Sequence, residues 1–197
     1  MQKLVIATGN AHKLHEIGSL LEPLGMEVVS QSAFNVPEAA EPHGTFIENA
    51  LAKARHAARL TGLPSLADDS GICVPALSGA PGVISAIYAG EPRSDKRNNE
   101  KLLEAMRGVS DRRAHYHCAL VFLRHADDPQ PIIAEGQWHG LLLEAPRGEG
   151  GFGYDPLFLD PKLNRTVAEI STADKNRLSH RGKALRALAE KLRSLQR

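Results

Sequence analysis

The stretch Leu66-Ala67-Asp68-Asp69-Ser70-Gly71 places two adjacent carboxylates directly after a short apolar run. The apolar run predicts a buried strand that ends where the carboxylates begin. Adjacent side chains of an extended segment point to opposite faces, so Asp68 and Asp69 are expected to have different roles. A hard divalent cation such as Mg²⁺ is often held by one or two carboxylates together with substrate phosphates. The alternative is a plain turn at a strand end, because Asp, Ser and Gly are also common turn residues.

Length and composition limit the class of protein. The 197 residues predict a single domain, residues 1–197, whose one core can be drawn out into two lobes. The 24 Lys and Arg nearly balance the 23 Asp and Glu, so the composition gives no argument for nucleic acid or membrane binding. Cys73 and Cys118 are far apart in the sequence, which favours reduced thiols. With no leader-like or membrane-spanning apolar stretch, we expect a cytoplasmic protein.

The first motif lies near the N-terminus. Leu4-Val5-Ile6-Ala7 is a continuous apolar run that predicts a strand covered on both faces. It is followed by Thr8-Gly9-Asn10 and then by a helical pattern with Lys13 in its first turn. Such a loop aims backbone N–H groups and the positive end of a helix dipole at an anion, and Lys13 would then face a phosphate. The motif is neither of the standard glycine-rich phosphate loops, and strand-loop-helix starts are common.

A helix leads back to the two carboxylates. Thr45 with Glu48 three residues later forms a capping box, and Gly62 ends the helical pattern. Asn49 and Lys53 lie one turn apart on a stripe beside the apolar face. Because this helix connects directly to the Asp68-Asp69 strand, a functional role is favoured for Lys53 over plain exposure.

A glycine-rich loop forms the second concentrated signal. Residues 148–156 hold four glycines within six residues, together with Phe152, Tyr154 and Asp155. Ordering so many glycines is entropically unfavourable, so the backbone is expected to approach a ligand closely there. Aromatic rings can stack on a planar ligand, and a carboxylate can accept hydrogen bonds from its edge. The pattern therefore predicts a binding site for a nucleotide base.

The last helix begins with basic residues. Ser179 is a suitable N-cap, which places His180 and Arg181 in the first turn. Cations are unfavourable at this end of a helix by a few tenths of a kcal/mol, so an anionic or carbonyl-bearing ligand is the favoured explanation. Lys175, five residues before His180, can join them.

Together these segments resemble the inosine triphosphate pyrophosphatase family, whose bacterial members hydrolyse dITP, ITP and XTP to the monophosphate and pyrophosphate. The resemblance spans nearly the whole chain, with its motifs in the family's order. Six motifs carry it: Thr8-Gly9-Asn10-x-x-Lys13, Thr45-Phe46-x-Glu48-Asn49-Ala50-x-x-Lys53-Ala54, Ala67-Asp68-Asp69-Ser70-Gly71, Gly79-Ala80-Pro81-Gly82, Gly151-Phe152-Gly153-Tyr154-Asp155-Pro156 and Ser179-His180-Arg181.

The resemblance implies an α/β fold with an elongated mixed sheet and flanking helices, two lobes around a central cleft, a homodimer and dependence on Mg²⁺. It implies that Asp69 holds the metal and activates water, and that Lys13 and Lys53 act as catalytic ligands of the triphosphate. The remaining residues that it implies for substrate binding are Thr8, Gly9 and Asn10 in the phosphate loop, Ser70 beside the substrate, and Phe152, Gly153, Tyr154, Asp155, Lys175, His180 and Arg181 around the base.

One departure concerns the second metal carboxylate. The family usually has an acid, one residue and then glycine before Thr-Phe, whereas residues 41–45 read Glu-Pro-His-Gly-Thr. The second carboxylate is therefore either Glu41, which we favour, or Glu38.

The chemistry that the resemblance implies is consistent with these residue types. Cleavage of the α,β anhydride by water needs charge neutralisation by Mg²⁺ and lysines, with a carboxylate as base. A donor such as Arg181 or a backbone N–H, matched to the 6-oxo group of hypoxanthine or xanthine, would be left unpaired by adenine, which can reject the analogue by roughly 10⁴-fold. Two alternatives are a nucleotide sensor without catalysis and a pyrophosphatase of the same fold that prefers modified pyrimidines.

Overall fold

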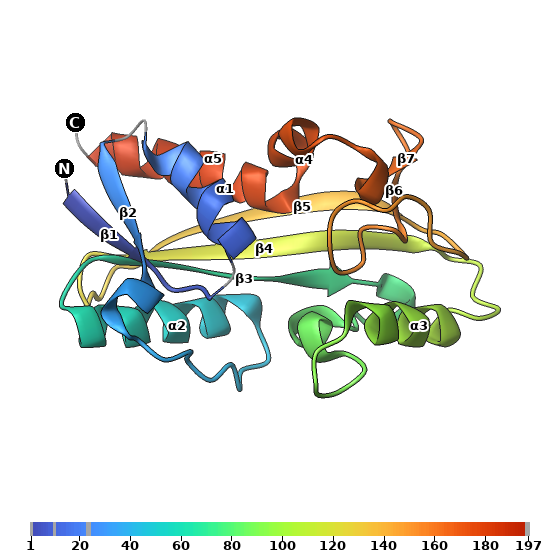
Figure 1. Cartoon of the computed structure of the whole chain (residues 1–197), viewed down its shortest axis with the longest axis horizontal. Coiled ribbons are helices and arrows are strands. Elements are labelled where there is room, and N and C mark those ends of the chain that lie inside the picture. The colour runs from blue at the N-terminus through green and yellow to red at the C-terminus, as the bar shows by residue number, and fades with distance from the viewer. Residues whose placement is uncertain (1, 10, 23–24, 196–197) are drawn as a thin grey trace. The chain divides into compact units, whose positions relative to one another are not determined.

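The computed structural model describes residues 2–9, 11–22 and 25–195. It is a mixed α/β fold whose helices flank a seven-stranded sheet of order β2-β1-β3-β4-β5-β6-β7 (Figure 1). The chain divides into two compact units. Unit 1 comprises residues 1–69, 118–136 and 181–197, and unit 2 comprises residues 70–117 and 137–180.

The strands in the described part of the chain are β1 (Gln2–Ile6), β2 (Met26–Ser30), β3 (Ser65–Cys73), β4 (Arg113–Leu123), β5 (Ile132–Leu142), β6 (Phe158–Asp160) and β7 (Arg165–Thr166). The α-helices there are α1 (Ala11–Leu21), α2 (Phe46–Thr61), α3 (Asp95–Ala105), α4 (Thr172–Leu178) and α5 (His180–Leu195). Short 3₁₀ helices occupy Gln31–Phe34, Pro75–Leu77, Gly82–Ile87 and Val167–Glu169.

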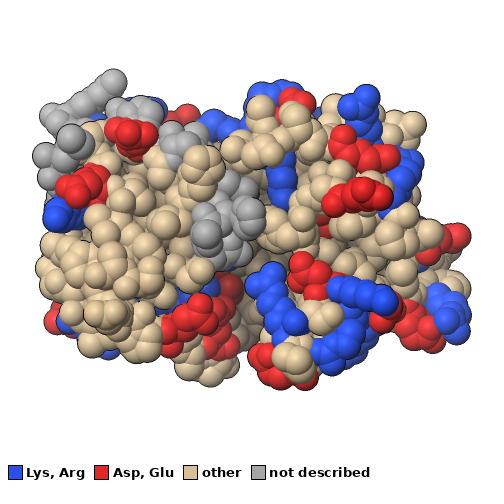
Figure 2. Space-filling view, in the orientation of Figure 1, with Lys and Arg blue, Asp and Glu red and all other residues tan. Residues whose placement is uncertain are grey.

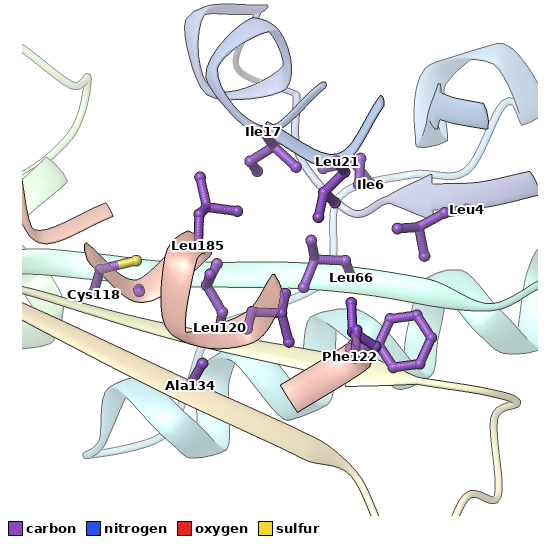
Figure 3. Close-up of a cluster of buried hydrophobic side chains, with 13 residues drawn as sticks. Leu4, Ile6, Ile17, Leu21, Leu66, Cys118, Leu120, Phe122, Ala134 and Leu185 are labelled. Atoms are coloured by element: carbon purple, nitrogen blue, oxygen red, sulfur yellow. The ribbon is translucent and has the colours of Figure 1, made fainter. Parts of the chain in front are cut away.

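Unit 1 is built on parallel strands with apolar side chains on both faces. β1 pairs in parallel with β2 and with β3, and Val5 lies opposite Ser65. Helices α1 and α5 cover one face and α2 covers the other (Figure 1). Figure 3 shows Ile17 and Leu21 of α1 and Leu185 of α5 gathered around Leu66 and Leu120. The fully covered strands explain why residues 4–7 form an uninterrupted apolar run.

Helix α2 confirms the capping signals in the sequence. The Thr45 hydroxyl accepts a hydrogen bond from the Glu48 N–H at 3.2 Å, and Gly62 ends the helix with a positive φ of 68°. The face toward the sheet carries alanines at positions 50, 54 and 57, all fully buried against β1, β3 and β4. This packing holds the opposite, polar edge of α2, with Asn49 and Lys53, in a fixed position beside β3.

Unit 2 has its own core. Leu102 of α3 and Met106, which follows it, pack with Ile72, Trp138 and Phe158. Strands β5, β6 and β7 pair antiparallel in turn. Helix α3 has Ser94 as its N-cap, whose side chain accepts a hydrogen bond from the Arg97 N–H.

The expectation that the β3 strand ends at the two carboxylates is wrong. β3 runs from Ser65 through Asp68, Asp69, Ser70 and Gly71 to Cys73, so the carboxylates lie in the middle of a buried strand. Turn propensity is outweighed because both carboxylates are paired with side chains of other elements, which makes the strand environment favourable.

The first and last α-helices follow the signals in the sequence. The helical pattern predicted after residues 8–10 is α1, which ends at Leu21. The 3₁₀ helix Gln31–Phe34 follows β2. Ser179 ends α4, and α5 begins at His180, so the expected place of His180 and Arg181 in a first turn is confirmed.

The surface charges and the helices can be compared with the expectations from composition. On the face that Figure 2 shows, Lys and Arg side chains lie among Asp and Glu side chains. None of the helices in the described ranges combines the length and the apolar character needed to cross a bilayer.

Candidate active site

Asp68 lies between two cationic side chains in unit 1, those of Lys13 and Arg181. Its Oδ2 lies 2.8 Å from Lys13 Nζ and 3.4 Å from Arg181 Nε. The Asp68 side chain is only 1% exposed. Burial opposes ionisation, but the charges of Lys13 and Arg181 outweigh it and hold the pKa of Asp68 well below its usual range. Asp68 is therefore a permanent anion that fixes two cations from α1 and α5.

Asp69 has a different environment, as the alternation of the strand predicts. Its Oδ1 lies 3.4 Å from Lys53 Nζ, and its Oδ2 accepts a hydrogen bond of 3.3 Å from Asn49 Nδ2. Burial raises the pKa of Asp69 to about 6, and the nearby charge of Glu41 adds to this effect while Lys53 opposes it. A carboxylate with this pKa can accept a proton close to neutral pH.

Lys53 brings a second carboxylate to the same place. Its Nζ lies 3.2 Å from Glu41 Oε2 as well as 3.4 Å from Asp69 Oδ1. Burial favours the neutral amine, but the surrounding carboxylates raise the pKa of Lys53, so it stays charged. Two carboxylates thus converge on one cation from the loop before α2 and from β3. Oxygen ligands of this kind suit a hard divalent ion.

Glu38, the alternative to Glu41, lies against the loop after β1. A Cβ atom added to Gly9 would overlap Glu38 Oε1. The Glu38 carboxylate therefore lies directly against the backbone at Gly9, and a larger residue at position 9 would displace it.

Asn49 is a residue that the sequence predictions left out of the site. It is fully buried, and its amide donates to the His43 carbonyl at 3.2 Å and accepts from the His43 N–H at 3.0 Å. The same Nδ2 donates to Asp69. Asn49 therefore ties the loop before α2 to β3. In the sequence, its spacing of one helical turn from Lys53 was the feature that could have assigned Asn49 to the site.

The predicted phosphate loop begins where β1 ends. Thr8 is half-buried and Gly9 is exposed, while Asn10 lies outside the described residues. Lys13 lies in the first turn of α1, as expected, and its ammonium group reaches Asp68.

In unit 2, the Asp155 carboxylate accepts hydrogen bonds from the glycine-rich loop and from α4. It is buried, with 3% exposed, and its Oδ2 accepts hydrogen bonds from the Phe152 N–H at 3.0 Å and from Lys175 Nζ at 2.6 Å. Lys175 Nζ also lies 4.1 Å from the centre of the half-buried Phe152 ring. A Cβ atom on Gly151, whose φ is 75°, would overlap the Asp155 carboxylate. The glycines therefore let the loop wrap tightly around one carboxylate.

The loop is also fixed to its surroundings in unit 2. The Gly153 N–H donates to Asp95 at 2.6 Å, and its carbonyl accepts from Asn99 at 2.7 Å, both on α3. Tyr154 is buried, and its hydroxyl donates to the Ser85 carbonyl at 2.8 Å. Tyr154 thus serves as an anchor of the loop, and Phe152 is the aromatic ring that is partly open to a ligand.

The remaining predicted residues divide between the units. His180 is buried and its ring stacks on that of Tyr116 in unit 2, with centroids 4.8 Å apart. Ser70 follows Asp69 in β3 and is half-buried. Arg181 was predicted beside the base, and the structure places its guanidinium group on Asp68 in unit 1.

Comparison with known proteins decides the family. The model of the Ham1 family matches residues 4–191. The chain belongs to the Ham1 family. This Ham1 chain is 64% identical over 192 residues to the dITP/XTP pyrophosphatase of Nitrosomonas europaea. The aligned region covers 98% of the chain and 95% of that relative. It is 57% identical over 192 residues to the dITP/XTP pyrophosphatase of Neisseria meningitidis serogroup B, with 97% and 96% covered.

Solved structures give the same result. A HAM1 protein from Coxiella burnetii superimposes on the Ham1 chain with a TM-score of 0.94 at 45% identity, covering 98% of the chain and 100% of that protein. A nucleoside-triphosphatase / dITP/XTP pyrophosphatase from Mycobacterium abscessus gives a TM-score of 0.78 at 37% identity, with 95% and 97% covered. The family resemblance that the six motifs indicated, and the mixed α/β fold, are both confirmed.

Proposed function

We propose that this Ham1 protein is a Mg²⁺-dependent pyrophosphohydrolase that converts dITP, ITP and XTP to the nucleoside monophosphate and pyrophosphate, removing deaminated purine nucleotides from the precursor pool. The observation that carries the proposal is Asp69, a buried carboxylate with a raised pKa that lies beside Lys53 and Glu41. Relatives up to 64% identical carry the name dITP/XTP pyrophosphatase, which supports the same activity.

The cations of unit 1 suit the triphosphate. Lys13 stands at the start of α1, where backbone N–H groups and the helix dipole also favour an anion. Lys53 adds a second positive charge beside Asp69. These groups can offset the charge that develops on pyrophosphate as it leaves.

Asp69 and Glu41 are the residues that would hold Mg²⁺. When bound, the ion would neutralise phosphate charge during the reaction. No three His, Cys, Asp or Glu side chains are grouped to hold a metal ion within residues 2–9, 11–22 and 25–195. Mg²⁺ is commonly bound by one or two carboxylates together with substrate phosphates and water. The convergence of two carboxylates on Lys53 fits such a site.

The reaction uses Asp69 as the base. Asp69 takes a proton from a water molecule whose oxygen forms a bond to the α-phosphorus. The bond between the α-phosphorus and the α,β-bridging oxygen breaks, and the electron pair leaves with pyrophosphate. Lys13 and Lys53 stabilise the leaving group electrostatically. Asn49 orients Asp69 through its hydrogen bond to Oδ2.

The aromatic cluster of unit 2 suits the base. Phe152 offers a ring for stacking, with the Lys175 ammonium group over it, and His180 stacks on Tyr116 in the same unit. A donor matched to the 6-oxo group of hypoxanthine or xanthine would be left unpaired by the 6-amino group of adenine. The family resemblance further supports a cytoplasmic homodimer whose partners are purine nucleoside triphosphates.

Product analysis tests the proposal. The protein is incubated with Mg²⁺ and either dITP or dGTP, supplied separately at neutral to alkaline pH. We expect dIMP and pyrophosphate from dITP, with dGTP nearly untouched. Inorganic phosphate as the product, or equal use of dGTP, would contradict the proposal, and tight binding of dITP without any product would indicate a sensor.

A further inference from the structure

We propose that Tyr116 is a positioning residue for base recognition: its hydroxyl fixes Asp155 and its ring fixes His180, so selectivity for the base depends on it. This inference rests on the proposed function. Tyr116 belongs to none of the six sequence motifs.

The position of Tyr116 suits this role. It lies on β4 between the buried residues Ala114 and Cys118 and is itself buried. Its ring contacts the Phe158 ring, with centroids 4.6 Å apart, and so is held by the core of unit 2. Residues 148–156 of the glycine-rich loop contain no strand and are held by hydrogen bonds to their surroundings. Tyr116 therefore offers this loop a rigid point of reference.

The hydroxyl of Tyr116 acts on the loop through Asp155. It donates to Asp155 Oδ1 at 3.1 Å, while Asp155 Oδ2 accepts from Phe152 and Lys175. Asp155 thus receives three hydrogen bonds from the protein itself. Its role is to set the position of the Phe152 backbone and of the Lys175 ammonium group that lies over the Phe152 ring.

Tyr116 remains a donor at every working pH. Burial raises the pKa of its hydroxyl well above the ordinary range, and the charge of Asp155 raises it further. Phenylalanine at this position would keep the ring packing and remove only the hydrogen bond.

The ring of Tyr116 acts on His180. The two rings are nearly parallel, at 13°, with centroids 4.8 Å apart. His180 is the first residue of α5, where the helix itself restrains only the backbone. The stacked Tyr116 ring therefore restrains the plane of the imidazole. Two predicted base-site residues that are far apart in the sequence are thereby linked through one tyrosine.

Tyr116→Phe tests the inference, with Tyr88→Phe as a matched loss of a hydroxyl elsewhere in unit 2. For Tyr116→Phe we expect the KM for dITP to rise about 10-fold with kcat within about 2-fold, because a hydrogen bond to a charged group is lost. The preference for dITP over dATP should fall. The inhibition constant of inorganic tripolyphosphate, which has no base, should stay unchanged. Tyr88→Phe should behave as the wild type in all three measurements.

A second variant separates the proposed coupling from a general folding defect. Asp155→Asn keeps the shape of the side chain, and we expect the same rise in KM and a non-additive double variant with Tyr116→Phe. If wild type hydrolyses dITP but Tyr116→Phe matches Tyr88→Phe, or if the effects of the two substitutions simply add, the inference is wrong while the proposed function stands. An equal loss of tripolyphosphate affinity would show a general structural effect and would also overturn it. Absence of dITP hydrolysis by the wild type would instead refute the proposed function.

Discussion

Asp69→Asn should lower kcat for dITP by at least about 10³-fold, because the variant loses the proposed general base and a proposed metal carboxylate together. Asparagine has the same shape and can still accept the hydrogen bond from Asn49, so the fold should remain intact. The measurement is kcat at saturating dITP and Mg²⁺, with circular dichroism as the check of folding. Activity close to wild type would remove Asp69 from its proposed role.

The same variant should be more stable than the wild type at pH 7.5. The raised pKa of Asp69, about 6, means that the folded protein binds this proton more tightly than the unfolded chain, whose carboxyl titrates near the ordinary value of about 4. The stability from protonation is fully present below about pH 4 and is lost as pH rises through about 6. The neutral asparagine avoids that loss, so the melting temperature should rise, by about 2–4 °C for each kcal/mol recovered.

Calorimetry at two pH values checks this stability effect. The gain of Asp69→Asn should be present at pH 7.5 and should shrink as pH approaches about 4. Asp127→Asn, which alters a carboxylate with 89% of its side chain exposed, is the control and should change little at either pH. A lower melting temperature for Asp69→Asn at pH 7.5 would contradict the burial of an unfavourable charge.

Asp68→Asn should have the opposite effect on stability. Removing the charge that Lys13 and Arg181 share should lower the free energy of unfolding by about 3–5 kcal/mol, as expected when one member of a buried ion pair is lost. Because the pKa of Asp68 is lowered by folding, its contribution is present above about pH 4 and is lost as pH falls further. The difference between variant and wild type should therefore diminish in acid.

Urea unfolding at pH 7.5 measures the Asp68 effect. The control is again Asp127→Asn, whose partner Arg59 is 3.9 Å away on the exposed surface, and its change should stay below about 1 kcal/mol. A loss for Asp68→Asn no larger than that of the control would show that the cluster is not held together by this carboxylate.

Local signals were sufficient to predict parts of the fold. Helix α2 was predictable because its cap at Thr45 and its stop at Gly62 are determined by neighbouring backbone groups. The apolar run at residues 4–7 predicted β1 because a strand covered on both faces needs no alternation. In both cases the deciding interactions lie within a few residues.

The continuation of β3 could not be predicted in this way. Asp68 and Asp69 have turn propensity locally, and the partners that stabilise Asp68 in the strand are Lys13 and Arg181, the second of which is separated from it by 113 residues. The role of Tyr116 could not be predicted from the sequence for a related reason. In the sequence it is one aromatic residue in an alternating strand, and only the fold brings it to Asp155 and His180.

In the candidate site too, some features could be predicted from local sequence and others needed the structure. Lys53 and Asn49 could be assigned to one edge of α2 from helical spacing, but the bond from Asn49 to Asp69 needed the structure. The departure near Glu41 left its role open in the sequence, and the ion pair with Lys53 now supports Glu41 as the second carboxylate.

Hydrolysis of dITP in ¹⁸O-labelled water, followed by ³¹P NMR of both products, tests the central claim most directly. If water activated by Asp69 attacks the α-phosphorus, the label should appear in dIMP and be absent from pyrophosphate. Label in pyrophosphate would mean that water attacks the β-phosphorus, and label in inorganic phosphate would mean that a different bond is cleaved; either result would contradict the account.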